Sequence, residues 1–355
     1  MLNKLSDIEE KYAEIERLIS DPATVSNPVE YAKLMKEYKR QAPIIEAYRN
    51  YTKILADAED ARILMDDTDA DLAALAEAEY FDKKKKLDAL EQELKALLLP
   101  RSPDDDKNVI IEIRAGAGGE EAALFVADLY RMYTMYTETA GFKTEPINKN
   151  ETELGGIKEI SFMVIGDGAF SRFKFESGVH RVQRVPETES QGRIHTSTVT
   201  VAVLPEADDV EVEINPADLK IETCKSSGAG GQHINKTESA IRIIHKPTGI
   251  IVECQEERSQ FKNRDKALKM LKSKLLDIKQ REQADAIASA RRSQVGTGDR
   301  SERIRTYNYH ESRVTDHRIG LTLYSLESFL NGDIGKMIDE LTAADTAARL
   351  QGETE

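Results

Sequence analysis

The sequence predicts an α+β protein with several domains. We expect an N-terminal helical arm over residues 1–105, a central α+β domain formed by residues 106–220 and completed by residues 299–355, and an inserted α/β domain over residues 221–298. Three observations predict this organisation. Apolar residues recur at helical spacing near the N-terminus, strand-like alternation follows a breaker-rich boundary, and 355 residues that are 40% hydrophobic suffice for two or three cores.

The helical arm is predicted by apolar residues at steps of three and four. They are Leu5, Ile8, Tyr12, Ile15 and Leu18, and further along Leu87, Leu90, Leu94 and Leu97. Asn27 followed by Pro28 is typical of a helix start, because proline fits the first helical position. Prolines and acidic residues at 100–106 mark the end of the arm. Its interleaved charges are those of solvated helix faces, so we expect a docking arm rather than an active site.

The central domain begins with a strand, a glycine turn and a helix. Apolar residues alternate over residues 109–113, and the turn at 116–121 leads into a helix from about Ala122. A dinucleotide-binding fingerprint requires glycine at the position of Glu121, and carboxylates at a helix tip repel a pyrophosphate. Glu120 and Glu121 suit a hydrogen-bond donor instead, such as the edge of a nucleobase. Further strands are predicted at residues 159–165, 197–204, 210–214, 303–309 and 321–324.

The inserted domain is predicted to be a hairpin followed by a long helix. The hairpin strands are residues 240–245 and 250–254, and the helix begins at about Asn263. The strand pattern at 217–224 is weak. Cys224 and Cys254 are too few for a disulfide framework or a four-ligand metal site, and we expect buried free thiols.

Charge is unevenly distributed along the chain. The formal net charge is −14, yet residues 221–320 hold 20 Lys and Arg against 13 Asp and Glu. Because attraction to phosphate is local and screened, a basic module in an acidic protein can still dock on RNA or DNA. The alternative is a solvated helix face on residues 261–292. The start of the chain lacks a secretory pattern and no apolar run can span a bilayer, so we expect a cytoplasmic protein without a membrane partner.

A polar segment at residues 178–196 is the first candidate site. It contains Arg181, Gln183, Arg184, Thr188, Arg193, His195 and Thr196, which suit phosphates and base edges. Single-stranded RNA is read by such groups, because unstacked bases offer their edges to hydrogen bonds and their faces to flat side chains. A polar surface loop on a sheet is the alternative interpretation.

The second candidate site is the glycine-rich stretch at residues 226–237. Gly230, Gly231 and Gln232 lie in it, and glycine lets a backbone approach another molecule closely. A phosphate loop requires glycine where Asn235 stands. Since an amide does not titrate near neutral pH, Gln232 is neither base nor nucleophile. It can position a water and offer hydrogen bonds to developing charge, with the remaining catalytic groups supplied by a partner. The histidines form no catalytic or metal-binding pattern, and we expect no metal or other cofactor.

Three tracts resemble one known family, at residues 226–237, 180–188 and 303–320. It is the bacterial peptide chain release factor 1 family, the class I release factors specific for UAA and UAG, and the resemblance extends over essentially the whole chain. It implies a codon-recognition core in the central domain and a GGQ hydrolysis domain in the inserted one. The implied activity is ribosome-dependent promotion of peptidyl-tRNA ester hydrolysis, not that of an autonomous enzyme.

The same resemblance implies which residues read a stop codon. Its codon tripeptide falls on Pro186, Glu187 and Thr188, and Thr188 together with His195 serves the second base. Glu187 departs from the family pattern, which has a small apolar residue there. The sister factor that reads UGA has Ser-Pro-Phe at these positions, which disfavours that specificity.

The remaining codon-reading residues follow in the same way. Gln183 and Thr196 serve the third base, while Gly118 and Glu121 face the first-position uridine. The flat ring of His195 is suited to stacking between bases.

For hydrolysis, the resemblance places the backbone N–H of Gln232 against the leaving ribose hydroxyl and its side chain beside the attacking water. It also implies N5-methylation of Gln232 by a dedicated glutamine methyltransferase. The other implied partners are the ribosomal decoding and peptidyl transferase centres, the mRNA stop codon, P-site peptidyl-tRNA and a GTPase recycling release factor. Two alternatives stay open: a codon-independent ribosome-rescue hydrolase and a non-enzymatic RNA-binding regulator.

Overall fold

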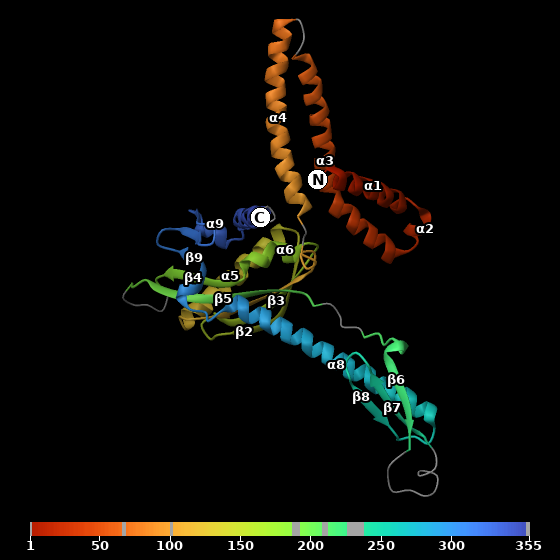
Figure 1. Ribbon diagram of the computed structural model, residues 1–355. Coiled ribbons are helices and arrows are strands. Elements are labelled where there is room, and N and C mark those ends of the chain that lie inside the picture. The colour runs from red at the N-terminus through yellow and green to blue at the C-terminus, as the bar shows by residue number, and fades with distance from the viewer. Residues whose placement is uncertain are drawn as a thin grey trace. The chain divides into compact units, whose positions relative to one another are not determined.

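A computed structural model describes residues 2–65, 69–99, 102–186, 192–207, 212–225 and 238–352. The chain forms two compact units, one of Met1–Ser102 with Asp339–Glu355 and one of Pro103–Ile338 (Figure 1). Helix α10 (Gly335–Gly352) runs from the second unit into the first. The first unit therefore includes C-terminal residues that the sequence analysis assigns to the central domain.

The arm is a set of packed helices. They are α1 (Leu2–Ile19), α2 (Pro22–Val25), α3 (Pro28–Leu64) and α4 (Ala70–Leu98). Leu5 of α1, Ala47 of α3 and Leu94 of α4 form a buried cluster, which confirms the apolar spacing as a core-facing stripe. Helix α3 begins at Pro28 with Asn27 at the N-cap, as predicted. No helix in the described ranges combines the length and apolar character needed to cross a bilayer.

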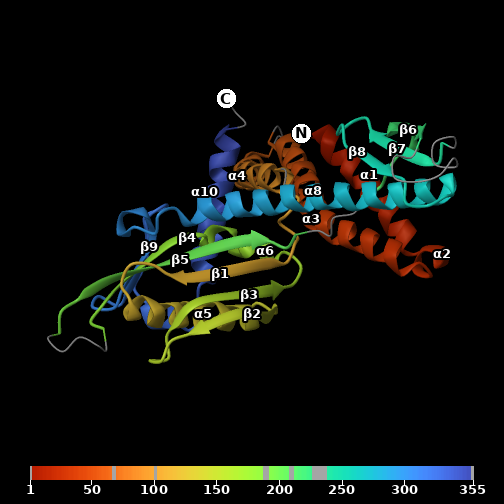
Figure 2. The same cartoon turned by 90° about the horizontal axis from the view of Figure 1, so that it is seen from below.

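The central sheet has eight strands in the order β11-β10-β9-β4-β5-β1-β3-β2. Figure 2 shows β4, β5, β1, β3 and β2 side by side. Neighbouring strands are antiparallel except β4 and β9, which are parallel. The strands are β1 (Val109–Ala115), β2 (Lys143–Glu151), β3 (Ile157–Ile165), β4 (Gly178–Arg184), β5 (His195–Pro205), β9 (Arg303–Asn308), β10 (Arg313–Asp316) and β11 (Leu321–Leu323). The associated helices are α5 (Glu120–Thr139), α6 (Ala169–Phe173) and α9 (Leu326–Leu330).

Helix α5 packs on β1, β3 and β5 through an apolar face. Phe125, Val126 and Leu129 of α5 are fully buried, as are Ile111 and Ile113 of β1. Each fully buried side chain of this size stabilises the folded state by about 1.5–3 kcal/mol relative to exposure. This packing fixes the N-terminus of α5 at one end of the sheet.

The inserted domain is a three-stranded antiparallel sheet covered by a long helix. Its elements are β6 (Leu219–Cys224), β7 (Ala240–His245), β8 (Ile251–Cys254) and α8 (Gln260–Val295), in the sheet order β6-β7-β8. Ala267 and Leu271 of α8 pack on Ile243 and Val252. At the other end of α8, the Gln294 amide bonds both the N–H and the C=O of Val203 in β5, at 2.8 and 2.9 Å.

Most predicted elements are confirmed, and three differ. Residues 212–214 are not a strand, and the rest of that predicted strand, 210 and 211, lies outside the described residues. Residues 178–184 form β4 rather than part of a loop, and β6 is a full strand despite its weak pattern. The expected boundary between residues 220 and 221 lies inside β6. Cys254 is buried as expected, whereas Cys224 is only half-buried.

A buried ionic network joins β9 to the segment before β4. The Arg305 guanidinium donates to both oxygens of Glu176, at 2.6 and 2.7 Å, and to Asp316 at 3.2 Å. All three side chains are fully buried. Burial by itself raises the pKa of Glu176, but Arg305 outweighs it and holds that pKa below its ordinary value. The carboxylate therefore stays charged at neutral pH.

We predict that Glu176→Ala destabilises the central sheet by about 3–5 kcal/mol, because Arg305 loses its bidentate partner while it remains buried. Hydrogen exchange of the β9 amides measures this effect as faster local opening. The control is Glu311→Ala, which breaks an ion pair with Arg313 whose side chains are 49% and 38% exposed and is expected to change stability by less than about 0.5 kcal/mol. Equal exchange rates in the two variants would contradict the prediction.

Candidate functional site

The turn between β1 and α5 is held against β5 by backbone hydrogen bonds. The Gly116 N–H donates to the Thr198 C=O at 2.9 Å, and the Thr198 N–H donates to the Ala117 C=O at 2.8 Å. The Ala117 N–H also donates to the Thr198 hydroxyl at 2.9 Å. Gly118 has φ of +138°, and a Cβ there would overlap the side chain of Ser197. Glycine is therefore required at 118 by backbone conformation and by space.

Strands β4 and β5 carry four of the predicted site residues in register. Gln183 lies opposite Thr196, and Arg184 lies opposite His195. Because residues directly opposite share one face of a sheet, Gln183 and Thr196 lie on one face, and His195 lies on the other with Arg184. His195 is exposed, while Gln183 and Thr196 are half-buried. The register thus places Gln183 beside Thr196, the two residues that the resemblance assigns to the third base.

The tip of the β4–β5 hairpin is described only in part. Pro186 lies two residues beyond the end of β4 and is buried. The predicted readers Glu187 and Thr188 lie outside the described residues. Gly118, Gln183, Pro186, His195 and Thr196 thus belong to the hairpin and to the turn bonded to it.

Glu121 differs from the expectation that its carboxylate is presented outward. Its side chain is 5% exposed, and Oε1 accepts a hydrogen bond from Arg184 Nε at 2.5 Å. The carboxylate is paired with Arg184 inside the protein, so it is not available to a base. The backbone N–H groups of the first helical turn have no carbonyl partner within the helix, and Glu121 lies in that turn. A contact between Glu121 and a ligand would therefore use the backbone.

Arg184 is the centre of a charged cluster behind this site. Its Nη1 donates to Asp128 Oδ2 at 2.7 Å and to the Tyr309 hydroxyl at 3.2 Å. Its guanidinium also lies 5.1 Å from the centroid of the Tyr309 ring. Burial lowers the pKa of Arg184, but Tyr309, Asp128 and Glu121 raise it above its ordinary value overall. The sequence pattern indicates Arg184 as an RNA contact but does not indicate its partners Asp128 and Tyr309, which are distant from it in the chain.

A hollow of about 410 Å³ lies beside this cluster. Asp128, Arg184 and Tyr309 line it, together with Arg131 and residues of α9. Burial, followed by the neighbouring Asp128 charge, raises the pKa of Tyr309 to about 12, so its hydroxyl keeps its proton at neutral pH. The hydroxyl is thus able to donate to Asp128, whose Oδ2 lies 3.3 Å away.

The glycine-rich stretch at residues 226–237, with Gly230, Gly231 and Gln232, lies outside the described residues. The residues on either side of the stretch are held by strand pairing and by a hydrogen bond. Cys224 pairs with Ala240, so the stretch connects adjacent ends of β6 and β7. The buried Asn263 amide donates to the Ser239 C=O at 2.8 Å, which ties the return of the stretch to α8.

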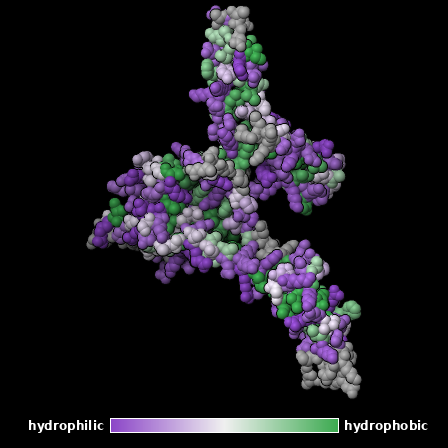
Figure 3. Space-filling view, in the orientation of Figure 1, coloured by the Kyte–Doolittle hydropathy of each residue, from purple (hydrophilic) through white to green (hydrophobic). Residues whose placement is uncertain are grey.

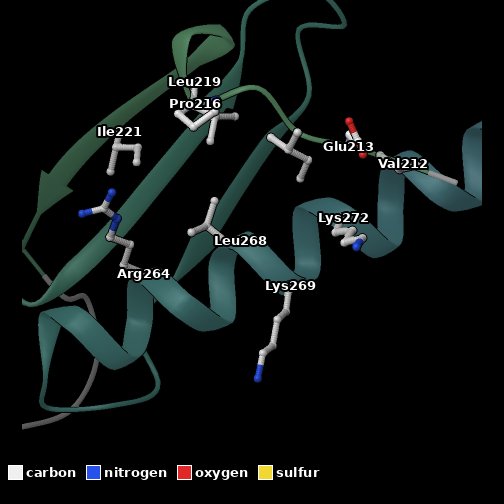
Figure 4. A pocket seen from close by; sticks show the side chains of 10 residues that line it. Val212, Glu213, Pro216, Leu219, Ile221, Arg264, Leu268, Lys269 and Lys272 are labelled. Carbon is white, nitrogen blue, oxygen red and sulfur yellow. The ribbon is translucent and has the colours of Figure 1, made fainter. Parts of the chain in front are cut away.

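A groove of about 640 Å³ runs along the inserted domain (Figure 4). Leu219, Ile221 and Leu268 form an apolar wall, and hydrophobic side chains gather beside hydrophilic ones on the face of this domain in Figure 3. Its cationic lining residues are Arg264, Lys269 and Lys272. Arg264 and Lys269 belong to α8, the helix within the predicted basic module. Among the residues described, no three His, Cys, Asp or Glu side chains are grouped to hold a metal ion.

Comparisons with known proteins agree over the length of the chain. A PCRF domain matches residues 8–201, and an RF-1 domain matches residues 208–318. The peptide chain release factor 1 proteins of Caldicellulosiruptor saccharolyticus and Clostridium tetani are 58% and 55% identical, each over 99% of both chains. A solved structure, RF2 of Thermus thermophilus, is 33% identical over 96% of both chains, with a TM-score of 0.48. The two domain matches and the identity to these relatives show that the chain belongs to the peptide chain release factor 1 family.

Proposed function

We propose that this protein terminates translation by reading UAA or UAG in the ribosomal A site and promoting hydrolysis of the P-site peptidyl-tRNA ester. The observation that carries the proposal is that Gly118, Gln183 and Thr196 lie together at one end of the central sheet. The turn that contains Gly118 is bonded to Thr198 of β5, two residues from Thr196, and Gln183 pairs with Thr196 across the hairpin. Membership of the release factor 1 family supports the same function.

The hairpin supplies the groups that codon reading requires. Gln183 offers an amide donor and acceptor, and Thr196 offers a hydroxyl beside it. The exposed His195 ring, on the opposite face, is suited to stacking on an unstacked base. Thr188 is proposed to serve the second base with His195. Backbone groups near Gly118 and Glu121 are proposed to contact the first-position uridine.

Hydrolysis is proposed to depend on Gln232, which cannot accept a proton near neutral pH. Its backbone N–H would stabilise the leaving ribose hydroxyl, while its side chain positions the attacking water. Gly230 and Gly231 would allow the backbone conformation that this requires. Catalytic groups beyond this loop would come from the peptidyl transferase centre, so the activity depends on the ribosome.

In this proposal each domain and each partner has a separate role. The arm docks, the central domain reads the codon in the decoding centre, and the inserted domain acts at the ester. The basic lining of the groove, with Arg264, Lys269 and Lys272, suits phosphate contacts. A glutamine N5-methyltransferase acting on Gln232 and a GTPase recycling release factor are proposed partners. The site of action is the cytoplasm.

Release of formyl-methionine from programmed ribosomes tests the proposed function. We expect release at UAA and UAG, and background release at UGA and sense codons. Equal release with and without a stop codon would favour a rescue hydrolase. No release at any codon, with ribosome or RNA binding retained, would favour a non-enzymatic regulator.

We predict that Gly231→Ala lowers the release rate by about 100-fold, the scale of losing one transition-state hydrogen-bond donor. Its affinity for UAA-programmed ribosomes is expected to stay the same. Single-turnover release and ribosome binding are measured side by side. Gly249→Ala is the matched control, because Gly249 lies in the same domain, has φ of +69° and has open space around its Cβ position. Normal release by ribosome-bound Gly231→Ala would refute the proposed role.

We predict that Thr188→Ala weakens discrimination against second-base changes more than it lowers the maximal rate. Loss of one hydrogen bond of about 1–1.5 kcal/mol corresponds to roughly tenfold in kcat/KM ratios. The ratio of kcat/KM for UAA to that for UCA measures this selectivity. Thr139→Ala, at the exposed C-terminal end of α5, is the control. An unchanged ratio in Thr188→Ala would contradict the assignment.

A further inference from the structure

We infer that Arg184 is a positioning residue for first-base recognition, holding the N-terminus of α5 against the codon-reading hairpin. The inference rests on the proposed function and extends it to a residue that does not touch the codon. Arg184 is the last residue of β4 and follows Gln183 directly. It therefore joins the β4–β5 hairpin to the N-terminus of α5, the two structural elements to which codon reading is assigned.

The geometry of the Arg184 cluster supports a positioning role. The guanidinium bonds Glu121 through Nε at 2.5 Å and Asp128 through Nη1 at 2.7 Å. Glu121 and Asp128 are seven residues apart on α5, hence two turns apart on one helix face. Contacts at two heights on α5 restrict both its rotation and its sliding along β4. The Tyr309 hydroxyl and ring hold the guanidinium from the segment after β9.

The same contacts argue against direct codon contact by Arg184. Its side chain is 18% exposed, and its Nε and Nη1 donate to Glu121, Asp128 and Tyr309. The other carboxylate oxygen of Glu121, Oε2, is buried and has no hydrogen-bond partner among the described residues. Removing Arg184 would leave that carboxylate buried without its cation. Glu121 would then move towards water, which displaces the first turn of α5.

In this displacement, only the α5 side of the turn at Gly118 would lose a contact. Its β5 side is held by the backbone bonds of Gly116 and Ala117 to Thr198. Its α5 side is held by the pairing of Glu121 with Arg184. Gln183 and Thr196 are paired within the hairpin itself, independently of Glu121. Loss of the Arg184 contacts should therefore affect the first base and spare the third.

Arg184→Lys tests the inference, because lysine keeps the charge but cannot bridge two carboxylates with a planar fork. Release rates are measured with UAA, with the first-base change CAA and with the third-base change UAU. The kcat/KM ratio of UAA to CAA is expected to fall about 10- to 100-fold, the scale of a misplaced binding group. The ratio of UAA to UAU is expected to stay within about twofold, since the Gln183–Thr196 pairing is retained.

Tyr309→Phe is the second variant, because it keeps the ring and removes only the hydroxyl. We expect the UAA to CAA ratio to fall by about threefold, less than in Arg184→Lys. Arg313→Lys is the matched control in the surface pair with Glu311, and it is expected to keep both ratios. Hydrogen exchange of the β9 amides verifies that each variant keeps the central sheet.

The possible outcomes separate this inference from the proposed function. Equal loss of both ratios, or unchanged ratios in Arg184→Lys and Tyr309→Phe, overturns the positioning role while wild-type release at UAA continues. A wild-type protein that releases nothing at UAA overturns the proposed function instead. Selective loss at the first base supports the inference, because a merely structural defect would lower release at all codons alike.

Discussion

The parallel pairing of β4 with β9 is the constraint on which the central domain depends. The chain leaves the sheet after β5, forms the three-stranded sheet, and returns through α8 before β9 lies beside β4. This pairing brings Arg305 of β9 to Glu176, a residue 129 positions earlier in the chain. A long connection makes such a contact entropically costly to form. Burial of the apolar sheet face and a fully satisfied ion pair offset that cost.

The same pairing determines where α8 must end. Its last turns lie along β5, where Gln294 occupies a backbone donor and acceptor of Val203. Arg291 of α8 bonds Glu112 of β1 at 2.6 Å. At the other end, Asn263 ties α8 to the return of the glycine-rich stretch at Ser239. One helix thus contacts both the sheet that carries the proposed reading site and the domain that carries the proposed hydrolysis loop.

Local patterns could predict the elements but not the contacts between them. Alternating apolar residues identified β7 and β8, and the glycine turn before α5 was evident from residue types alone. Strand β6 has a weak pattern because Lys220, Glu222 and Thr223 break the apolar run, and only its pairing with β7 makes it a strand. The hairpin that carries Pro186 was not predicted, because residues 178–184 have the pattern of a polar loop and form β4 only through pairing with β5 and β9. The inward orientation of Glu121 was not predicted either, because its partner Arg184 is 63 residues away in the chain.

The chemistry of the two sites explains why they are built so differently. Discrimination between bases requires donors and acceptors held to a fraction of an ångström, and the proposed reading site is a register-fixed hairpin whose half-buried Arg184 guanidinium is bonded to α5. The residue proposed to act at the ester is a neutral amide, which would contribute position rather than proton transfer. A group of this kind acts only where another molecule supplies the reacting ester and its surroundings. The glycine-rich stretch is accordingly carried on a separate small sheet, anchored at Ser239 and Cys224 and joined to the reading domain through α8.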